Sequence, residues 1–195
     1  TRTTVANVVT IGAKAANLGE MYTVGVGTGH ALPLPDHPLA IPFAHYARHL
    51  ASAGVQPLID ALIADYQAGT VDQAQLEQRL FAIRWQLYTA PVDPALLTQL
   101  TTLGRARWAD TTKIRFRSST NVEDLAEFTG AGLYTSAGAR LGDGDAALGN
   151  ALKTVWSSVW NPQAFVEREF YRVDQREVRM GVLVHPAQED ELANG

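Results

Sequence analysis

The chain has 195 residues, 46% of them hydrophobic, so it can bury a core, and we exclude a disordered protein in favour of one or two compact lobes. The formal net charge is −4 without a run of basic residues, and no segment predicts a membrane helix or a signal peptide, so we expect a cytoplasmic protein with neither a nucleic-acid nor a membrane partner. Because cysteine is absent, disulfides, thiolate nucleophiles and sulfur-ligated zinc are excluded as well.

The first part of the chain combines a short strand, a helix and a long loop in our prediction. Residues 4–11 are rich in Val and Thr, which favours a strand, and Gly12 then provides a turn. Good helix formers over residues 15–21 predict a helix, so that Lys14 lies where this helix begins. Residues 22–42 are rich in Gly and Pro and are predicted to form turns and extended chain.

Four helices are predicted next, because apolar residues recur at helical spacing between positions that end or cap helices. Gly54 and Gly69 end the first two helices. Thr70 and Gln73 fit the spacing of a capping box for the third helix. Asp93-Pro94 provides a cap and a first residue for the fourth helix.

The second half of the chain alternates strands with helices, and its Trp156 and Trp160 are expected in the core rather than on a stacking platform. Helices in a block, followed by strands separated by helices, predict a mixed α+β fold rather than a doubly wound sheet. In chain order, we expect a strand with one basic side at residues 113–118, a loop or hairpin at 129–144, helices at 147–159 and from 162 to about 172, and a strand at 178–184.

Three cations lie beside glycine or hydroxyl residues or on a predicted helix. Lys14 follows Gly12 closely, Arg84 lies at the edge of a helical apolar stripe, and Arg117 directly precedes two serines. A triphosphate is bound by such groups together, since a Lys, a forked Arg and short hydroxyl or backbone donors all neutralise its oxygens. A single cation of this kind is more often a solvated surface charge, so spacing alone does not assign these three residues.

Longer motifs carry a resemblance to a known family. Residues 114–125, continued by residues 128–134, resemble the signature of the pyruvate phosphate dikinase, phosphoenolpyruvate synthase and rifampicin phosphotransferase family, in which Arg-Ser-Ser is followed by Glu-Asp and a glycine-containing loop. Residues 11–21 resemble the family's Gly-Gly-Lys box, residues 154–160 its tryptophan-containing helix, and residues 180–184 the strand that leads to the hinge between lobes. The motifs follow the family's order over nearly the whole chain.

The resemblance implies an ATP-grasp fold, in which two lobes close on ATP. It identifies residues 1–195 as a partial ATP-grasp nucleotide-binding domain whose second lobe is incomplete. Within it we expect the Lys box and a Pro/Gly loop in residues 1–42, a helical block in 43–110, and the sheet-containing part with the Arg-Ser-Ser motif in 111–195.

The resemblance also implies roles for individual residues. Lys14 would contact phosphates, Arg117 would contact the transferring phosphoryl group as the catalytic residue, and Arg84 would support the same charge. A glycine-containing loop lets its backbone approach phosphate closely, and three residues around the end of the hinge-leading strand would lie beside adenine. The nucleotide-binding residues implied in this way are Lys14, Arg84, Arg117, Ser118, Ser119, Gly130, Ala131, Gly132, Val184, His185 and Ala187.

Two positions depart from the family pattern. Ala13 stands at the family's second glycine, so a positive φ at this position would strain the loop or alter its grip on phosphate. His185 stands where many relatives have Gln after the hinge strand, and it could be a pH-sensitive neighbour of adenine or a structural residue.

Other polar residues allow two interpretations. Glu123 and Asp124 could hold Mg²⁺, but we favour a salt bridge to Arg115 or a cap on the next turn. His45 and His49, four residues apart on a predicted helix, could geometrically bind a metal, but we interpret them as surface residues. We therefore assign no metal ligand in this chain.

These observations favour the ATP-binding portion of a dikinase-type phosphotransferase, with transfer to pyruvate or another small acceptor through domains outside this sequence. Mg²⁺ would be a second cofactor, bound by ligands of the second lobe, because phosphoryl transfer also needs a metal ion. Alternatives are a catalytically silent ATP-grasp-like binding or regulatory module, and the rifampicin or glucan phosphotransferase branch of the family. We expect these residues alone to be inactive, and a homodimer through an exposed apolar surface is a further possibility.

Overall fold

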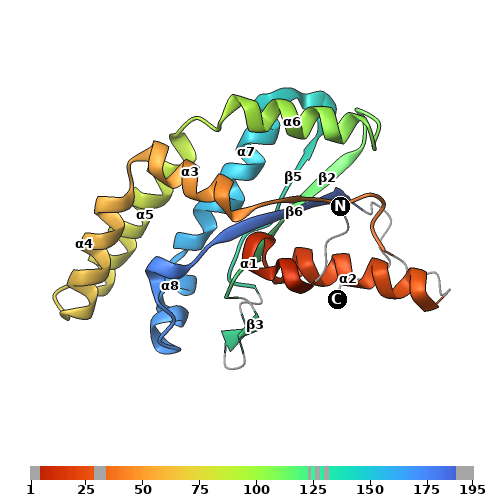
Figure 1. Ribbon diagram of the computed structural model, residues 1–195. Helices are drawn as coiled ribbons and strands as arrows, with labels where there is room; N and C mark the ends of the chain where they lie inside the picture. Colours follow the sequence, from red (N-terminus) through yellow and green to blue (C-terminus); the bar gives the residue numbers. More distant parts are fainter. Residues whose placement is uncertain (1–4, 29–33, 123, 126–127, 130–131, 188–195) are drawn as a thin grey trace.

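A computed structural model of the chain describes residues 5–28, 34–122, 124–125, 128–129 and 132–187. Its centre is a four-stranded sheet with helices on both faces, so the fold is mixed, as the sequence predicts (Figure 1). The strand order is β1-β6-β2-β5, and all three neighbouring pairs are antiparallel. The strands are β1 (Leu39–Ile41), β2 (Lys113–Thr120), β5 (Ala137–Arg140) and β6 (Met180–Pro186), while β3 (Asp124–Leu125) and β4 (Phe128–Thr129) form a separate hairpin.

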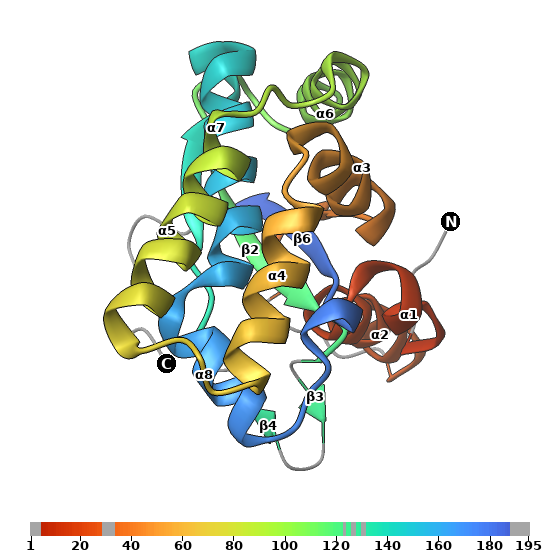
Figure 2. The ribbon, with the colours of Figure 1, turned by 90° about the vertical axis from the view of Figure 1, so that its left-hand side faces the viewer.

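Two sets of helices enclose the sheet, and Figure 2 shows α1 and α2 on one side with α5 and α7 on the other. Helices α1 (Val8–Ile11) and α2 (Ala13–Thr28) pack against β6 and β2, and α7 (Gly144–Ser157) packs against β2, β5 and β6. None of the helices in the described part of the chain combines the length and apolar character needed to cross a bilayer. The remaining helices are α3 (Phe43–Ala53), α4 (Gln56–Gln67), α5 (Gln73–Thr89), α6 (Pro94–Arg105) and α8 (Pro162–Phe170), with short 3₁₀ turns η1 (Val5–Asn7), η2 (Leu141–Asp143), η3 (Ser158–Trp160) and η4 (Gln175–Glu177).

The alternation of side chains along the strands explains why both faces of the sheet are covered. Phe116 on β2 and Val184 on β6 belong to the main core, to which α3, α4, α5, α6, α7 and α8 also contribute. Leu183 points to the opposite face, where it packs with Ile11 and Ala16 of α1 and α2. The predicted basic side of β2 is confirmed, because its first three odd-numbered residues are all exposed cations.

Local signals located most of the helices and their ends. Gly54 ends α3 in the left-handed conformation with φ of 65°, and the Asp93 side chain accepts a hydrogen bond from Ala95 N at 2.9 Å at the start of α6. The predicted burial of two tryptophans is also confirmed, since Trp156 and Trp160 both lie in the core.

The capping box of α5 lies two residues later than predicted. The sequence offers Thr70 and Gln73, but the structure uses Asp72, whose side chain accepts from Gln75 N at 2.8 Å. Gln75 Oε1 in turn accepts from Asp72 N at 3.0 Å. Asp is as good an N-cap as Thr, so the choice depends on which register brings the apolar stripe of α5 onto the core.

The first predicted strand is wrong. Described residues of this segment form the 3₁₀ turn η1 and the short helix α1, because Ile11 gains burial against the sheet from a helix and packing outweighs the β-propensity of Val and Thr. The loop predicted for residues 22–42 is wrong in two places: α2 continues to Thr28, and residues 39–41 form β1. A helix that is already nucleated adds a hydrogen bond for each further residue, which offsets the cost of its glycines.

The region predicted as loop or hairpin, residues 129–144, also contains regular structure. β4 ends at Thr129, and β5 forms the outer strand of the main sheet through its pairing with β2. In Figure 2 the β3–β4 hairpin lies at the lower end of the molecule, beyond the end of β2. The end of β2 therefore connects the sheet directly to this hairpin.

Candidate functional site

The start of α2 is fixed against the end of β2 by a backbone contact at Gly12. Gly12 has a φ of 82°, and a Cβ built on it would lie 2.1 Å from the carbonyl oxygen of Ser119. On the neighbouring strand, a Cβ on Gly181 would lie 2.6 Å from the carbonyl oxygen of Ile11. Side chains at these two positions would push the α1–α2 turn away from the sheet, so glycine is required for this close approach.

Two hydrogen bonds join the Lys box to the Arg-Ser-Ser motif. Lys14 Nζ donates to Ser118 Oγ at 3.4 Å, and Ala15 N donates to Ser119 Oγ at 3.0 Å. Both contacts bridge residues 104 positions apart in the sequence. Ser118 and Ser119 are buried and Lys14 is half-buried, so the lysine ammonium group is held at the end of the sheet rather than free in solvent.

Ala13 fits this turn without the strain considered from the sequence. It is the first residue of α2, it is buried, and it is not among the non-glycine residues with positive φ in the described part of the chain. The positive φ of the turn is at Gly12 instead. An alanine at position 13 therefore leaves the α2 start undistorted.

Arg117 directly precedes Ser118 on β2. It is exposed on β2 opposite Leu183 of β6, and strand alternation places it on the same face as Ser119, where α2 packs. Within the described residues its guanidinium has no ion-pair or hydrogen-bond partner. The structure thus brings Lys14, Ser118 and Ser119 together at one end of the sheet, and Arg117 occupies the preceding position of β2.

Arg84 lines a hollow between α5, α7 and the segment that precedes β5. This hollow has a volume of about 240 Å³, and its lining includes Arg84, Thr135 and Asn161. The Nε atom of Arg84 is buried and has no hydrogen-bond partner among the described residues. A buried unpaired donor costs free energy, and an anion in the hollow would supply the missing acceptor.

The end of the glycine-containing loop contributes to the Arg84 hollow. Gly132, with φ of 78°, begins the described part that leads to Thr135 in the Arg84 hollow, whereas Gly130 and Ala131 lie outside the described residues. The lining of this hollow does not include Lys14 or Arg117. Convergence of the three cations on one ligand stays a prediction.

The residues expected beside adenine are tied into the sheet. The side chain of Val184 is enclosed in the main core. His185 is half-buried with Nδ1 2.8 Å from the Pro186 carbonyl oxygen, and Ala187 N donates to Lys113 O at 2.8 Å. Contact of Val184, His185 and Ala187 with adenine stays a prediction.

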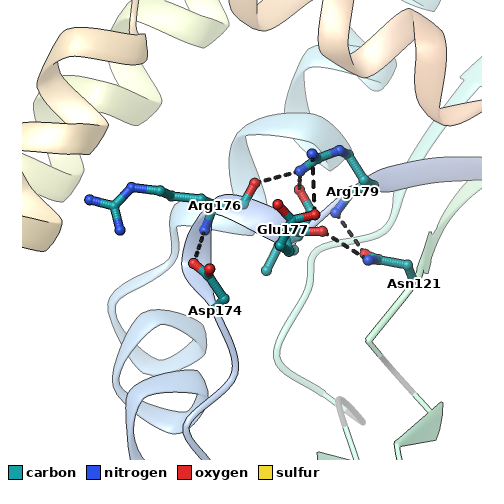
Figure 3. A network of polar contacts seen from close by, with 6 residues as sticks. Asn121, Asp174, Arg176, Glu177 and Arg179 are labelled. Carbon is teal, nitrogen blue, oxygen red and sulfur yellow. Dashed lines mark hydrogen bonds and ion pairs between the residues drawn. The ribbon is translucent and has the colours of Figure 1, made fainter.

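Asn121 is a residue of this region that the sequence did not suggest. It follows β2 directly and clamps the start of β6, as Figure 3 shows: its Nδ2 donates to Glu177 O at 2.8 Å, and Arg179 N donates to its Oδ1 at 2.7 Å. An Asn directly after a strand is a signal for such side-chain to backbone bonding. This clamp fixes the point at which the chain leaves the Arg-Ser-Ser strand for the β3–β4 hairpin.

The candidate metal ligands do not gather into a site where the structure describes them. No group of three or more His, Asp or Glu side chains suited to a metal ion occurs among the described residues, and the side chains of Glu123 and Asp124 lie outside them. The interpretation of His49 as a surface residue is wrong. It is buried, its Nε2 donates to Leu87 O at 2.9 Å, and its ring lies 4.9 Å from that of Trp156.

Comparison with known proteins identifies the family. Residues 8–193 match the family described as the pyruvate phosphate dikinase AMP/ATP-binding domain. A phosphoenolpyruvate synthase of Aeropyrum pernix is 26% identical over 182 residues, which cover 89% of this chain and 20% of that protein. The chain therefore spans about a fifth of the length of this relative. Together with the Lys14–Ser118 contact between its two motifs, the match shows that the chain belongs to the pyruvate phosphate dikinase AMP/ATP-binding domain family.

Proposed function

We propose that this chain is the ATP-binding part of a dikinase-type phosphotransferase related to phosphoenolpyruvate synthase. The observation that supports this most directly is the contact of Lys14 with Ser118 next to the exposed Arg117. Lys14 and Ser118 come from two distant motifs of an AMP/ATP-binding family and meet at the start of a helix.

The physical basis is charge neutralisation at a fixed position. A triphosphate carries several negative charges, and a half-buried ammonium group interacts with them more strongly than a fully solvated one. The positive end of the α2 dipole lies beside Lys14, which adds to the attraction for phosphate. Ser119 holds this helix start in place through the hydrogen bond from Ala15 N.

In our proposal, Arg117 and Arg84 also bind the triphosphate. Arg117 contacts the transferring phosphoryl group, since its guanidinium is exposed and unpaired among the described residues. Arg84 supports the same charge from the opposite side of the glycine-containing loop, where its buried Nε lacks an acceptor among the described residues. The backbone of Gly130, Ala131 and Gly132 approaches the phosphates between them.

The remaining parts of the proposal concern adenine, Mg²⁺ and the acceptor. Adenine lies beside Val184, His185 and Ala187 at the end of β6, and Mg²⁺ accompanies the triphosphate because the metal neutralises developing charge in phosphoryl transfer. The named relative is a phosphoenolpyruvate synthase, which supports pyruvate as the acceptor class. Transfer to the acceptor would use parts of the whole protein beyond this chain.

Titration calorimetry with ATP tests the proposal through Lys14→Ala. A charge-assisted hydrogen bond contributes about 1.5–3 kcal/mol, so we expect the dissociation constant for ATP to rise about tenfold to hundredfold. An ATP affinity that is unchanged in Lys14→Ala, or absent in the parent chain, would refute the proposed function.

Arg117→Ala and Arg115→Ala form a matched pair for the second cation. Both side chains are exposed on the same side of β2, but Arg115 lies one pleat further from Ser118. We expect Arg117→Ala to weaken ATP binding about tenfold and Arg115→Ala to change it less than about twofold. Equal effects would indicate general attraction by a basic strand rather than a specific contact.

A further inference from the structure

Arg168 is a fully enclosed cation that the nucleotide site does not use. It lies on α8 with 0% exposure, although arginine is almost never completely buried unless it is paired. Its guanidinium donates from Nε to Gln175 Oε1 at 2.7 Å, from Nη2 to Val159 O at 2.7 Å and from Nη1 to Tyr134 Oη at 3.3 Å. The group also lies 5.9 Å from the centre of the Trp160 ring.

The acceptors of Arg168 are neutral. None of the ion pairs within the described residues includes Arg168, and Gln175 separates it from the nearest bonded carboxylate, because Gln175 Nε2 donates to Glu169 Oε1 at 2.9 Å. Burying a charge without a carboxylate beside it is costly, so an apolar side chain would be the more stable way to fill this space. Arginine instead provides a planar guanidinium group, whose hydrogen bonds hold several segments of the chain in a defined arrangement.

The segment that this guanidinium group reaches is the end of the glycine-containing loop. Tyr134 follows Gly132 closely, and its hydroxyl accepts from Arg168. The preceding residue is held from the same side, because Asn161 Nδ2 donates to Leu133 O at 3.2 Å. Both Leu133 and Tyr134 are buried, so the loop end is anchored to α8 and to the residue that precedes it.

We infer that Arg168 is a positioning residue for ATP binding: through Tyr134 it holds residues 132–135, so that Gly132 and the segment after it meet phosphate in a preorganised conformation. This inference rests on the proposed function. A loop that is already ordered loses less conformational entropy when a ligand binds, which raises affinity without any contact to the ligand. Arg168 itself does not touch the nucleotide in this arrangement.

Tyr134→Phe tests the inference, with Tyr46→Phe as the matched control. Each variant removes one buried hydroxyl near Arg168; the Tyr46 hydroxyl accepts from Trp160 Nε1 at 3.2 Å and forms no hydrogen bond with the loop end in the described structure. We expect the dissociation constant for ATP to rise about threefold to tenfold in Tyr134→Phe and to stay within about twofold of the parent in Tyr46→Phe. Equal ATP affinities in the two variants would overturn the inference.

Amide hydrogen exchange without nucleotide separates this inference from the proposed function. Exchange at residues 132–135 should accelerate at least about threefold in Tyr134→Phe relative to Tyr46→Phe, because the loop end has lost its anchor. Accelerated exchange in a chain that does not bind ATP would leave the anchoring role standing and refute the proposed function. Unaltered exchange at residues 132–135 would overturn the anchoring role whatever the ATP affinity.

Discussion

At the scale of single residues, burial changes the chemistry of His49. Its Nε2 carries the proton, because the group 2.9 Å away is the Leu87 carbonyl oxygen, which can only accept. Burial lowers the pKa of His49 from the ordinary value of 6.5, and this effect exceeds the raising effect of the hydrogen bond to Leu87. Burial, followed by the charge of Arg48, also lowers the pKa of the half-buried His45. Both histidines are therefore held neutral by the fold.

The lowered histidine pKa values predict a loss of stability in mild acid. The unfolded chain binds protons near pH 6.5 while the folded chain binds them only at lower pH, so the unfolding free energy falls as pH decreases below about 6.5. Thermal unfolding between about pH 7.5 and about pH 5.5 should show a decreasing midpoint, with a shallower decrease in His49→Asn. A His49→Asn slope equal to that of the parent would contradict this account.

At the scale of elements, the α1–α2 turn depends on backbone contact with β2. Gly12 combines a positive φ with a carbonyl oxygen only 2.1 Å from the position that a Cβ would occupy, whereas Gly69, at the end of α4, has φ of 69° and open space around it. Substitutions at these two glycines therefore distinguish backbone strain from steric overlap. Gly69 reports conformational strain alone, and Gly12 reports strain together with steric overlap against the sheet.

Alanine substitutions at these two glycines should differ in their effect on stability. We expect Gly69→Ala to lower the unfolding free energy by about 1 kcal/mol and Gly12→Ala by about 3 kcal/mol or more, since the carbonyl of a central strand cannot move aside. Urea unfolding measures both values. Gly12→Ala should also weaken ATP binding because the α2 start and Lys14 shift with the turn. Equal losses in the two variants would show that the close contact is unimportant.

At the scale of the whole molecule, one continuous core joins the helices α3 to α7 with the sheet, and a smaller cluster attaches α1 and α2 to its other face. The proposed phosphate grip lies at the junction of the smaller cluster with the sheet. The folded unit spans about a fifth of the phosphoenolpyruvate synthase that it resembles. ATP binding by this unit can therefore be measured separately from the complete phosphoryl-transfer reaction.

The 195 residues alone should bind ATP without steady-state turnover. Cations position and neutralise the triphosphate, but phosphoryl transfer also requires Mg²⁺ and an acceptor held in line. A phosphate-release assay with ATP and Mg²⁺ checks this expectation. Hydrolysis that proceeds in the parent chain and disappears in Arg117→Ala would show that these residues suffice for the chemistry.

Local patterns in the sequence determined those helices and strands that depend on residues close together in the chain. Helical spacing and Asp93-Pro94 located α6, strand alternation located β2 with its exposed cations, and spacing of apolar residues placed Trp156 in the core. The family motifs identified the AMP/ATP-binding domain itself. These features follow from residues within a few positions of one another, where periodicity and capping act directly.

The tertiary structure decided what depends on partners far away in the chain. It made residues 8–11 a helix, because Ile11 gains burial against β6, and it placed His49 and Arg168 in the interior, where backbone and side-chain acceptors 38 and 7 positions away satisfy them. It also brought Lys14 to Ser118 across 104 residues. No local pattern encodes such contacts, since the same residues in an exposed setting would be ordinary solvated groups, and only the packed sheet brings their partners within bonding distance.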